Sequence, residues 1–151
     1  MKLLYGFIAQ AASISKHEHV SAVNIFHQVN FDKFPSAYPR PAIVLAFGLE
    51  ANEVGRDFEY SVILRDPRGQ HVTGKNAAGD EIVGVSGNFI AHERGFQGTT
   101  VVPILIETPG VIFPIAGQYY FEIFVGQKPI GRIPVFASQN QIEKPKDEYS
   151  I

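Results

Sequence analysis

Apolar and polar side chains alternate along most of this chain with the period of two that is typical of β-strands. The clearest example is residues 57–65, where Phe58, Tyr60, Val62 and Leu64 occupy every second position between polar neighbours. No stretch shows a helical period of useful length. The pattern therefore predicts an all-β fold.

The segment 117–136, GQYYFEIFVGQKPIGRIPVF, predicts a β-hairpin near the C-terminus. Its first strand carries apolar side chains at every second position from Tyr119 to Val125, and residues 126–128 supply a short turn. Pro129 and Pro134 interrupt the return strand. Because proline cannot donate a hydrogen bond to a β-ladder, we expect this strand to lie at an edge.

Further strands are predicted over residues 2–10, 20–31, 42–50, 70–75, 82–90 and 99–108. The first two are expected to form a hairpin, and Asp66-Pro67-Arg68-Gly69 matches a type I turn. Short strands separated by glycine, proline, asparagine and aspartate are typical of packed sheets. We therefore predict an antiparallel two-sheet β-sandwich of about eight strands, immunoglobulin-like or jelly-roll-like. A closed barrel is the alternative.

The length of 151 residues suits one domain. We assign residues 1–138 to a single β-sandwich domain and residues 139–151 to a polar C-terminal tail. The chain has no cysteine, so disulfides and thiolate metal sites are excluded. Its formal net charge of −2 supplies no basic field for a phosphate backbone, and we expect no nucleic-acid partner.

The first residues, MKLLYGFIAQAAS, contain an apolar run and an Ala9-Gln10-Ala11 step that resembles a signal-peptidase site. We interpret this run as a strand, because it is short, is interrupted by Gly6 and Gln10, and alternates from Leu3 to Ala9. No stretch reaches the ~20 apolar residues that span a bilayer. The expectation is a cytoplasmic protein without a membrane partner.

Several of these segments together resemble an uncharacterised family of small bacterial β-sandwich proteins, known only as a domain of unknown function. The resemblance rests on LLYGFIAQAASIS, on HVSAVNIFHQV, on Phe34-Pro35 with Pro39-Arg40, on RDPRG at 65–69 and on FPIAGQY at 113–119. The long, glycine-rich segment 77–98 and the turn His17-Glu18-His19 depart from the family pattern. The resemblance implies the fold and a cytoplasmic bacterial origin, and it implies no catalytic residue.

The best candidate for a binding surface is the connector 33–41, KFPSAYPRP. Its prolines hold Phe34, Tyr38 and Arg40 on a stiff backbone, which presents two aromatic rings and a guanidinium at low ordering cost. The alternative is that Phe34 closes the end of the core. Tyr120 and Phe124, on the Glu122 face of the hairpin, form a second candidate, either covered by a sheet or subunit or exposed as an apolar patch.

Candidates for chemistry are weaker. His17 and His19, with Glu18 or His27, have the residue types of a zinc or nickel site, but a solvated turn is the preferred interpretation, and we predict no metal and no cofactor. A His92-Glu93-Arg94 step lacks an accompanying nucleophile or second catalytic group.

We therefore predict a non-enzymatic, cytoplasmic protein-interaction or binding module that binds a protein partner or self-associates as a homo-oligomer. The alternative is a sandwich that binds a small ligand of the carbohydrate type through Tyr38, Tyr119, Tyr120 or nearby aromatic residues.

Overall fold

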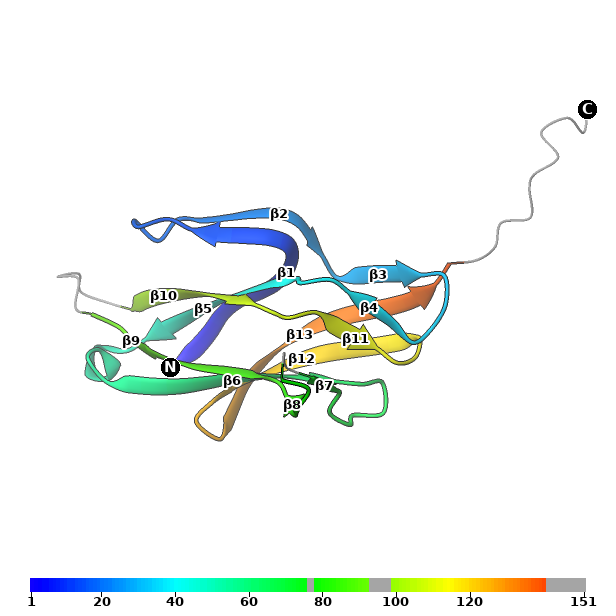
Figure 1. The fold of residues 1–151 in the computed structure, drawn as a ribbon. Coiled ribbons are helices and arrows are strands. Elements are labelled where there is room, and N and C mark those ends of the chain that lie inside the picture. Colours follow the sequence, from blue (N-terminus) through cyan, green and yellow to red (C-terminus); the bar gives the residue numbers. More distant parts are fainter. Residues whose placement is uncertain (76–77, 93–98, 141–151) are drawn as a thin grey trace, which may run out of the picture.

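The computed structural model describes residues 1–75, 78–92 and 99–140 and confirms the all-β prediction (Figure 1). Within these ranges the chain forms thirteen strands and a single turn of 3-10 helix. None of the helical structure in the described residues is long and apolar enough to cross a membrane.

The strands are β1 (Lys2–Ile14), β2 (Val20–Phe26), β3 (Gln28–Phe31), β4 (Ser36–Tyr38), β5 (Ala42–Leu49), β6 (Asp57–Arg65), β7 (Thr73–Lys75), β8 (Glu81–Val83), β9 (Val85–Ile90), β10 (Thr100–Glu107), β11 (Val111–Phe113), β12 (Gly117–Val125) and β13 (Lys128–Gln139). The 3-10 helix η1 (Ala51–Glu53) follows β5.

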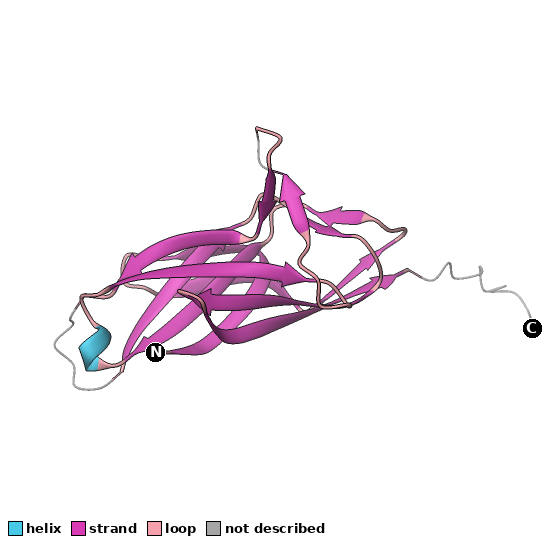
Figure 2. Ribbon diagram, turned by 90° about the horizontal axis from the view of Figure 1, so that it is seen from below, coloured by secondary structure: helices cyan, strands magenta, loops and turns pink. Residues whose placement is uncertain are grey.

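Two larger sheets carry most of the structure. The first sheet has the strand order β10-β5-β1-β2 and is antiparallel throughout. The second sheet has the order β3-β13-β12-β6-β9. Two short ribbons, β4–β11 and β7–β8, complete the fold, and the β7–β8 ribbon projects from one side of the body (Figure 2).

The two larger sheets share one hydrophobic core, because apolar side chains of both belong to a single buried cluster. The first sheet contributes Ile8, Ile43, Leu45, Phe47, Leu49 and Ile106, and the second contributes Val62, Leu64, Tyr119, Phe121, Ile123, Ile133 and Val135. Full burial of one such side chain stabilises a fold by about 1.5–3 kcal/mol. Because apolar residues recur at every second position, they lie on one face of each strand, and that face turns inward.

The β12–β13 hairpin is confirmed, with Gly126 and Gln127 between its strands. The β1–β2 hairpin and the strand Asp57–Arg65 are also confirmed. Pro129 and Pro134 lie in the part of β13 that pairs only with β12, and Pro103 lies in β10, an edge strand. The return strand was predicted to lie at an edge. This prediction is only partly right, because β13 lies between β12 and β3 and pairs with β12 alone over residues 128–135.

The predicted antiparallel pairing fails at one place. Residues 20–31 were predicted as one strand, but the chain breaks at His27, so that β2 stays in the first sheet while β3 joins the second, parallel to β13. This segment links the two sheets along one side (Figure 1). The sheets curl, and neither the two-sheet sandwich nor its count of about eight strands is confirmed.

The additional strands have local causes. The predicted strand 82–90 is divided at Gly84, whose φ of +75° ends β8 before β9 begins. The proline-rich connector contains β4, which pairs with β11. Gln139, the first residue of the predicted tail, pairs with Phe31, and residues 141–151 lie outside the described residues.

Tyr119 connects the core to the loop that precedes β12. Its ring is fully buried and meets the Phe113 ring edge-on at a centroid distance of 4.9 Å. Its hydroxyl donates to the carbonyl oxygen of Ile115 at 2.6 Å and accepts from the Ile115 N–H at 3.0 Å. Burial raises the pKa of the Tyr119 phenol.

We predict that Tyr119→Phe lowers the free energy of unfolding by about 1–3 kcal/mol, because both backbone groups of Ile115 lose their partner. Urea denaturation followed by circular dichroism measures the change. Tyr120→Phe, at the next position and on the opposite face, is the control and is expected to change stability by less than about 0.5 kcal/mol. Equal effects of the two variants would contradict the assigned role.

Asp66 organises the predicted turn after β6, which is confirmed by the 2.9 Å hydrogen bond from the Gly69 N–H to the Asp66 carbonyl. The Asp66 carboxylate accepts from the N–H groups of Arg68 and Gln70, both at 2.9 Å. Burial disfavours the ionised form, but these backbone donors and the Arg68 guanidinium outweigh it and hold the pKa of Asp66 below its usual range.

A depressed pKa in the folded state means that this stabilisation is present above about pH 4 and is lost as the pH falls through the folded-state pKa. We predict that wild-type protein loses more stability between pH 6 and pH 2.5 than Asp66→Asn, whose amide oxygen still accepts both backbone N–H groups. Urea midpoints measured across this range test the prediction, and parallel curves for the two proteins would refute it.

Candidate functional site

The side of the first sheet that faces away from the shared core is almost entirely apolar. We call it the outer face, and the strand register defines its rows. One row contains Val101, Gly48 and Lys2, the next Pro103, Ala46 and Tyr5, the next Leu105, Val44 and Phe7, and the next Glu107, Ala42, Ala9 and Ile25. Ala11 and Val23 extend it along the β1–β2 hairpin. Residues opposite one another in neighbouring strands share a face, so these side chains form one surface.

The centre of the outer face is built from small residues and its margin from large ones. Val44, Ala46 and Ala9 are completely buried, yet they do not belong to the core cluster. Five of the ten most exposed large hydrophobic side chains among the described residues lie on this face or its margin: Leu4, Tyr5, Val23, Ile25 and Val101. Ile25 and Val23 are the most exposed of them, at 59% and 57%.

A β-bulge at Leu4 sets the orientation of this face. The register shifts between Leu3 and Tyr5, so Leu3 packs against the core while Tyr5 turns to the opposite side of the sheet. The bulged Leu4 side chain lies against Gly48, where an added Cβ would come within 3.1 Å of it. The alternation in the sequence predicted Leu3 and Tyr5 on the same face. This prediction is wrong, because the bulge turns the two side chains to opposite faces.

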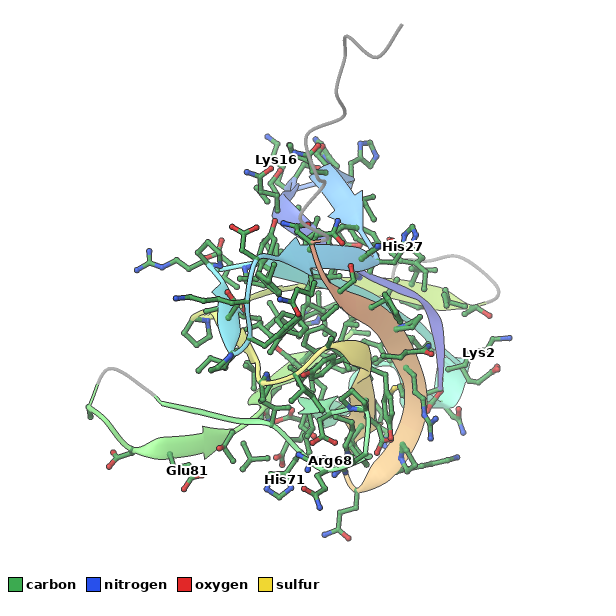
Figure 3. The ribbon with its side chains drawn as sticks, turned by 90° about the vertical axis from the view of Figure 1, so that its right-hand side faces the viewer. Lys2, Lys16, His27, Arg68, His71 and Glu81 are labelled. Atoms are coloured by element: carbon green, nitrogen blue, oxygen red, sulfur yellow. The ribbon has the colours of Figure 1, made fainter. Side chains whose placement is uncertain are left out.

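Opposite charges lie in the rows of the outer face at the two ends of β5. Lys2 pairs with Gly48 at one end of β5, and Glu107 pairs with Ala42 at the other end, and both side chains are exposed. The rows between these ends hold only apolar residues. Figure 3 labels Lys2 and, far from it on the tip of the β1–β2 hairpin, Lys16.

The predicted connector residues do not form a joint surface. Phe34 and Tyr38 are half-buried and pack against the core cluster, which supports the alternative interpretation of Phe34. The Phe34 ring meets the Phe31 ring edge-on at 5.6 Å, and the Tyr38 ring lies 4.7 Å from the Phe26 ring. Arg40 alone is exposed, with a φ of +45°.

Tyr120 and Phe124 are half-buried on the outward side of the second sheet. The guanidinium of Arg132 lies over the Tyr120 ring, 4.5 Å from its centroid. Glu122, between the two aromatic residues, lies 3.6 Å from Arg65 and 3.8 Å from Arg132. Charged groups thus interrupt this patch, which differs in this respect from the outer face of the first sheet.

A groove of about 510 Å³ runs beside Tyr38. Its walls combine the rings of Phe26, Phe31 and Tyr38 with the amides of Gln10, Asn24, Gln28 and Asn30. Two of these amides already bond to each other, because the Asn24 side-chain nitrogen donates to the Gln10 side-chain oxygen at 2.6 Å. Tyr119, another of the proposed sugar contacts, is fully buried and therefore unavailable.

The histidines of the first turn are exposed, and the His17 and His19 rings lie 6.4 Å apart. Within the described ranges, no group of three or more His, Cys, Asp or Glu side chains has the arrangement of a metal site. His92 is exposed, whereas Glu93 and Arg94 of the same candidate lie outside the described residues.

A cavity of about 640 Å³ opens where the two larger sheets separate beside the β4–β11 and β7–β8 ribbons. Its floor is formed by buried core residues, among them Ile43, Val62 and Phe121. Gly84 lines its rim, and an added Cβ there would clash with the Val62 carbonyl oxygen. The sequence pattern did not predict this cavity. The feature of the sequence that marks it is Gly84, the glycine that interrupts residues 82–90.

These features define an all-β protein with an apolar sheet face and a cavity that reaches the core. The chain belongs to the family of unknown function DUF6941, whose family model matches residues 4–138. This match confirms the resemblance to an uncharacterised domain family. No curated protein matches the chain.

We predict that Gly84→Ala destabilises the protein by at least about 1 kcal/mol more than Gly69→Ala. Both glycines have positive φ values, +75° and +83°, so alanine at either position is destabilised by roughly 1–2 kcal/mol in this left-handed backbone conformation. Only at Gly84 does the new methyl group meet backbone, whereas nothing lies within 4 Å of the position at Gly69. Equal losses in urea denaturation would contradict the close approach of the β8–β9 link to β6.

Proposed function

We propose that this protein is a non-enzymatic, cytoplasmic interaction module that self-associates through the outer face of the first sheet. The observation that carries the proposal is the gathering of exposed apolar side chains on one sheet face, which also carries opposite charges in the rows at the two ends of β5. Contiguous apolar patches of this kind mark interaction sites in folded proteins. We also interpret the two larger sheets as the layers of a distorted β-sandwich, because they share one core cluster.

The charge arrangement favours a second copy as the partner. In a two-fold dimer with the outer faces packed together and the strands antiparallel across the interface, the Lys2 end of each face meets the Glu107 end of the other. A two-fold interface uses the same patch on both copies and must therefore be self-complementary. Lys2 and Glu107 meet this condition, because the two-fold axis brings Lys2 of each copy toward Glu107 of the other and so creates two such contacts.

The size of the face is sufficient for a weak dimer. Three strands about 4.8 Å apart, β10, β5 and β1, with rows along the 8 residues of β5 at about 3.3 Å each, cover roughly 380 Å² per copy. The total of roughly 760 Å² is below the size of a standard specific interface and fits a weak, transient dimer. We therefore expect a dissociation constant in the micromolar range.

The outer face also explains why proline and a bulge occur at its margins. Pro103 lies in β10 and the Leu4 bulge in β1, so neither strand presents a long, regular ladder at the margin of the face. Such interruptions oppose edge-to-edge addition of further strands. Face-to-face packing then closes the assembly at two copies.

The carbohydrate alternative is supported only by the groove beside Tyr38. Its aromatic and amide side chains are of the types that contact sugars, but several of its amides bond to neighbouring side chains. A sugar would have to replace these bonds and gains little from doing so. The apolar face therefore supports the stronger proposal.

We predict that Ile25→Lys weakens dimerisation at least tenfold, equivalent to about 1.4 kcal/mol, because a lysine ammonium would be buried against apolar side chains. Sedimentation velocity and light scattering over a micromolar concentration series measure the dissociation constant. Ile115→Lys is the matched control, since Ile115 is 40% exposed and lies outside the outer face.

Variants that exchange the charges of Lys2 and Glu107 test the proposed orientation of the dimer with the same measurement. Lys2→Glu and Glu107→Lys should each weaken the dimer, and the double variant should restore it, because both end contacts regain opposite charges. A wild-type protein that remains monomeric at every concentration, or a double variant weaker than either single one, would refute the proposed dimer.

A further inference from the structure

We propose that the cavity beside Gly84 binds a small, largely apolar molecule that carries an amine. This site is separate from the outer face, because its walls come from the core side of the sheets and from the two ribbons. Its volume of about 640 Å³ falls within the range of about 300–1,000 Å³ that is typical of small-molecule sites.

The cavity is apolar at its floor because it continues the core. Ile43, Val62 and Phe121 line it and are 1%, 3% and 4% exposed. Leu64 and Val111 also line it and are buried. An apolar group that enters the cavity therefore replaces water against side chains that already belong to the core cluster, at about 25 cal/mol for each Å² removed from water.

Thr108 and Glu81 offer acceptors to the cavity. The Thr108 hydroxyl is buried and donates its hydrogen to the Pro41 carbonyl oxygen at 2.8 Å, so its remaining lone pairs accept. Glu81 is the one residue with an ionisable side chain among the described residues that line the cavity, and its carboxylate is exposed. Both groups favour a ligand that donates hydrogen bonds.

The position of Glu81 decides the sign of the preferred charge. Glu81 lies on β8 in the ribbon that projects beyond the body, where Figure 3 labels it. A ligand whose apolar part fills the floor would place its polar end toward this rim. An ammonium group gains attraction from the carboxylate there, while a carboxylate or phosphate group meets repulsion.

The rim itself is formed by backbone that needs glycine. Gly74 of β7, Gly84 between β8 and β9, and Gly110 between β10 and β11 all line the cavity. At Gly84 and Gly110 the φ values are +75° and +108°, a region that other residues rarely adopt. Their amide groups are also convenient reporters, because each lies at the cavity and is distinct in sequence from the outer face.

Three eight-carbon probes test the charge preference: octylamine, octanol and octanoate at neutral pH. Each is titrated into the full chain, and binding is followed through the amide resonances of Gly74, Gly84 and Gly110. We expect octylamine to bind most tightly and octanoate most weakly. Gly48, on the outer face, is the internal control, and probe-induced shifts centred there instead would overturn the proposal.

Variants separate the cavity from other apolar surfaces. Val85→Trp places an indole in the cavity and should abolish probe binding, and Thr73→Trp provides a second filling variant at the same site. Ile90→Trp is the matched control, because Ile90 is 47% exposed on β9, the strand that carries Val85, and does not line the cavity. Glu81→Gln should weaken octylamine about fivefold and leave octanol unchanged.

Three results would overturn the proposal: no shift with any probe, tighter binding of octanoate than of octylamine, or an equal loss in Ile90→Trp and in both filling variants. Dimerisation is measured separately on the same samples. A failed dimer with intact octylamine binding would refute the proposed function and leave the cavity site standing, and the reverse result would do the opposite.

Discussion

Burial of β5 on both faces is the constraint on which this structure depends. Every residue of the strand Ala42–Leu49 is buried. Its larger side chains face the core shared by the two sheets, and its smaller ones, Val44 and Ala46, lie under the outer face. A strand with two apolar faces needs cover on both. The second sheet packs closely on one face. On the other face Val44 and Ala46 are completely buried, and the β1–β2 hairpin lies on that side of β5 (Figure 1).

The linkage of the two sheets has an equally local origin. Residues 20–31 form a nearly continuous extended segment, but the break at His27 lets its first part pair with β1 and its second part with β13. The two sheets are thereby tied together beside the core, and this geometry leaves the opposite side open between the ribbons. The cavity floor at Ile43 and Phe121 lies where the core meets that opening.

The period of two was sufficient to predict the class of fold, the two hairpins and the strand Asp57–Arg65, because alternation follows directly from strand geometry. It was not sufficient for the pairing of β3 or the face of Tyr5. A single bulged residue at Leu4 exchanges the two faces, and a one-residue step leaves little trace in an alternating pattern. The sequence also did not show which way the candidate binding residues of the connector point, and Phe34 and Tyr38 turn toward the core. The continuous apolar run AIVLAFGL in β5 was the available signal for the outer face.

The two proposed sites share β5 and are separated by it. Ile43 lines the cavity, and the next residue, Val44, lies beneath the outer face, so their side chains point to opposite sides of one strand. A ligand could influence dimerisation only by displacing β5, which would disturb close packing on both of its faces. The free energy needed to displace β5 exceeds the free energy of ligand binding or of dimerisation, because several fully buried side chains would lose contacts together. The two sites are therefore expected to act independently, with β5 as a rigid partition between them.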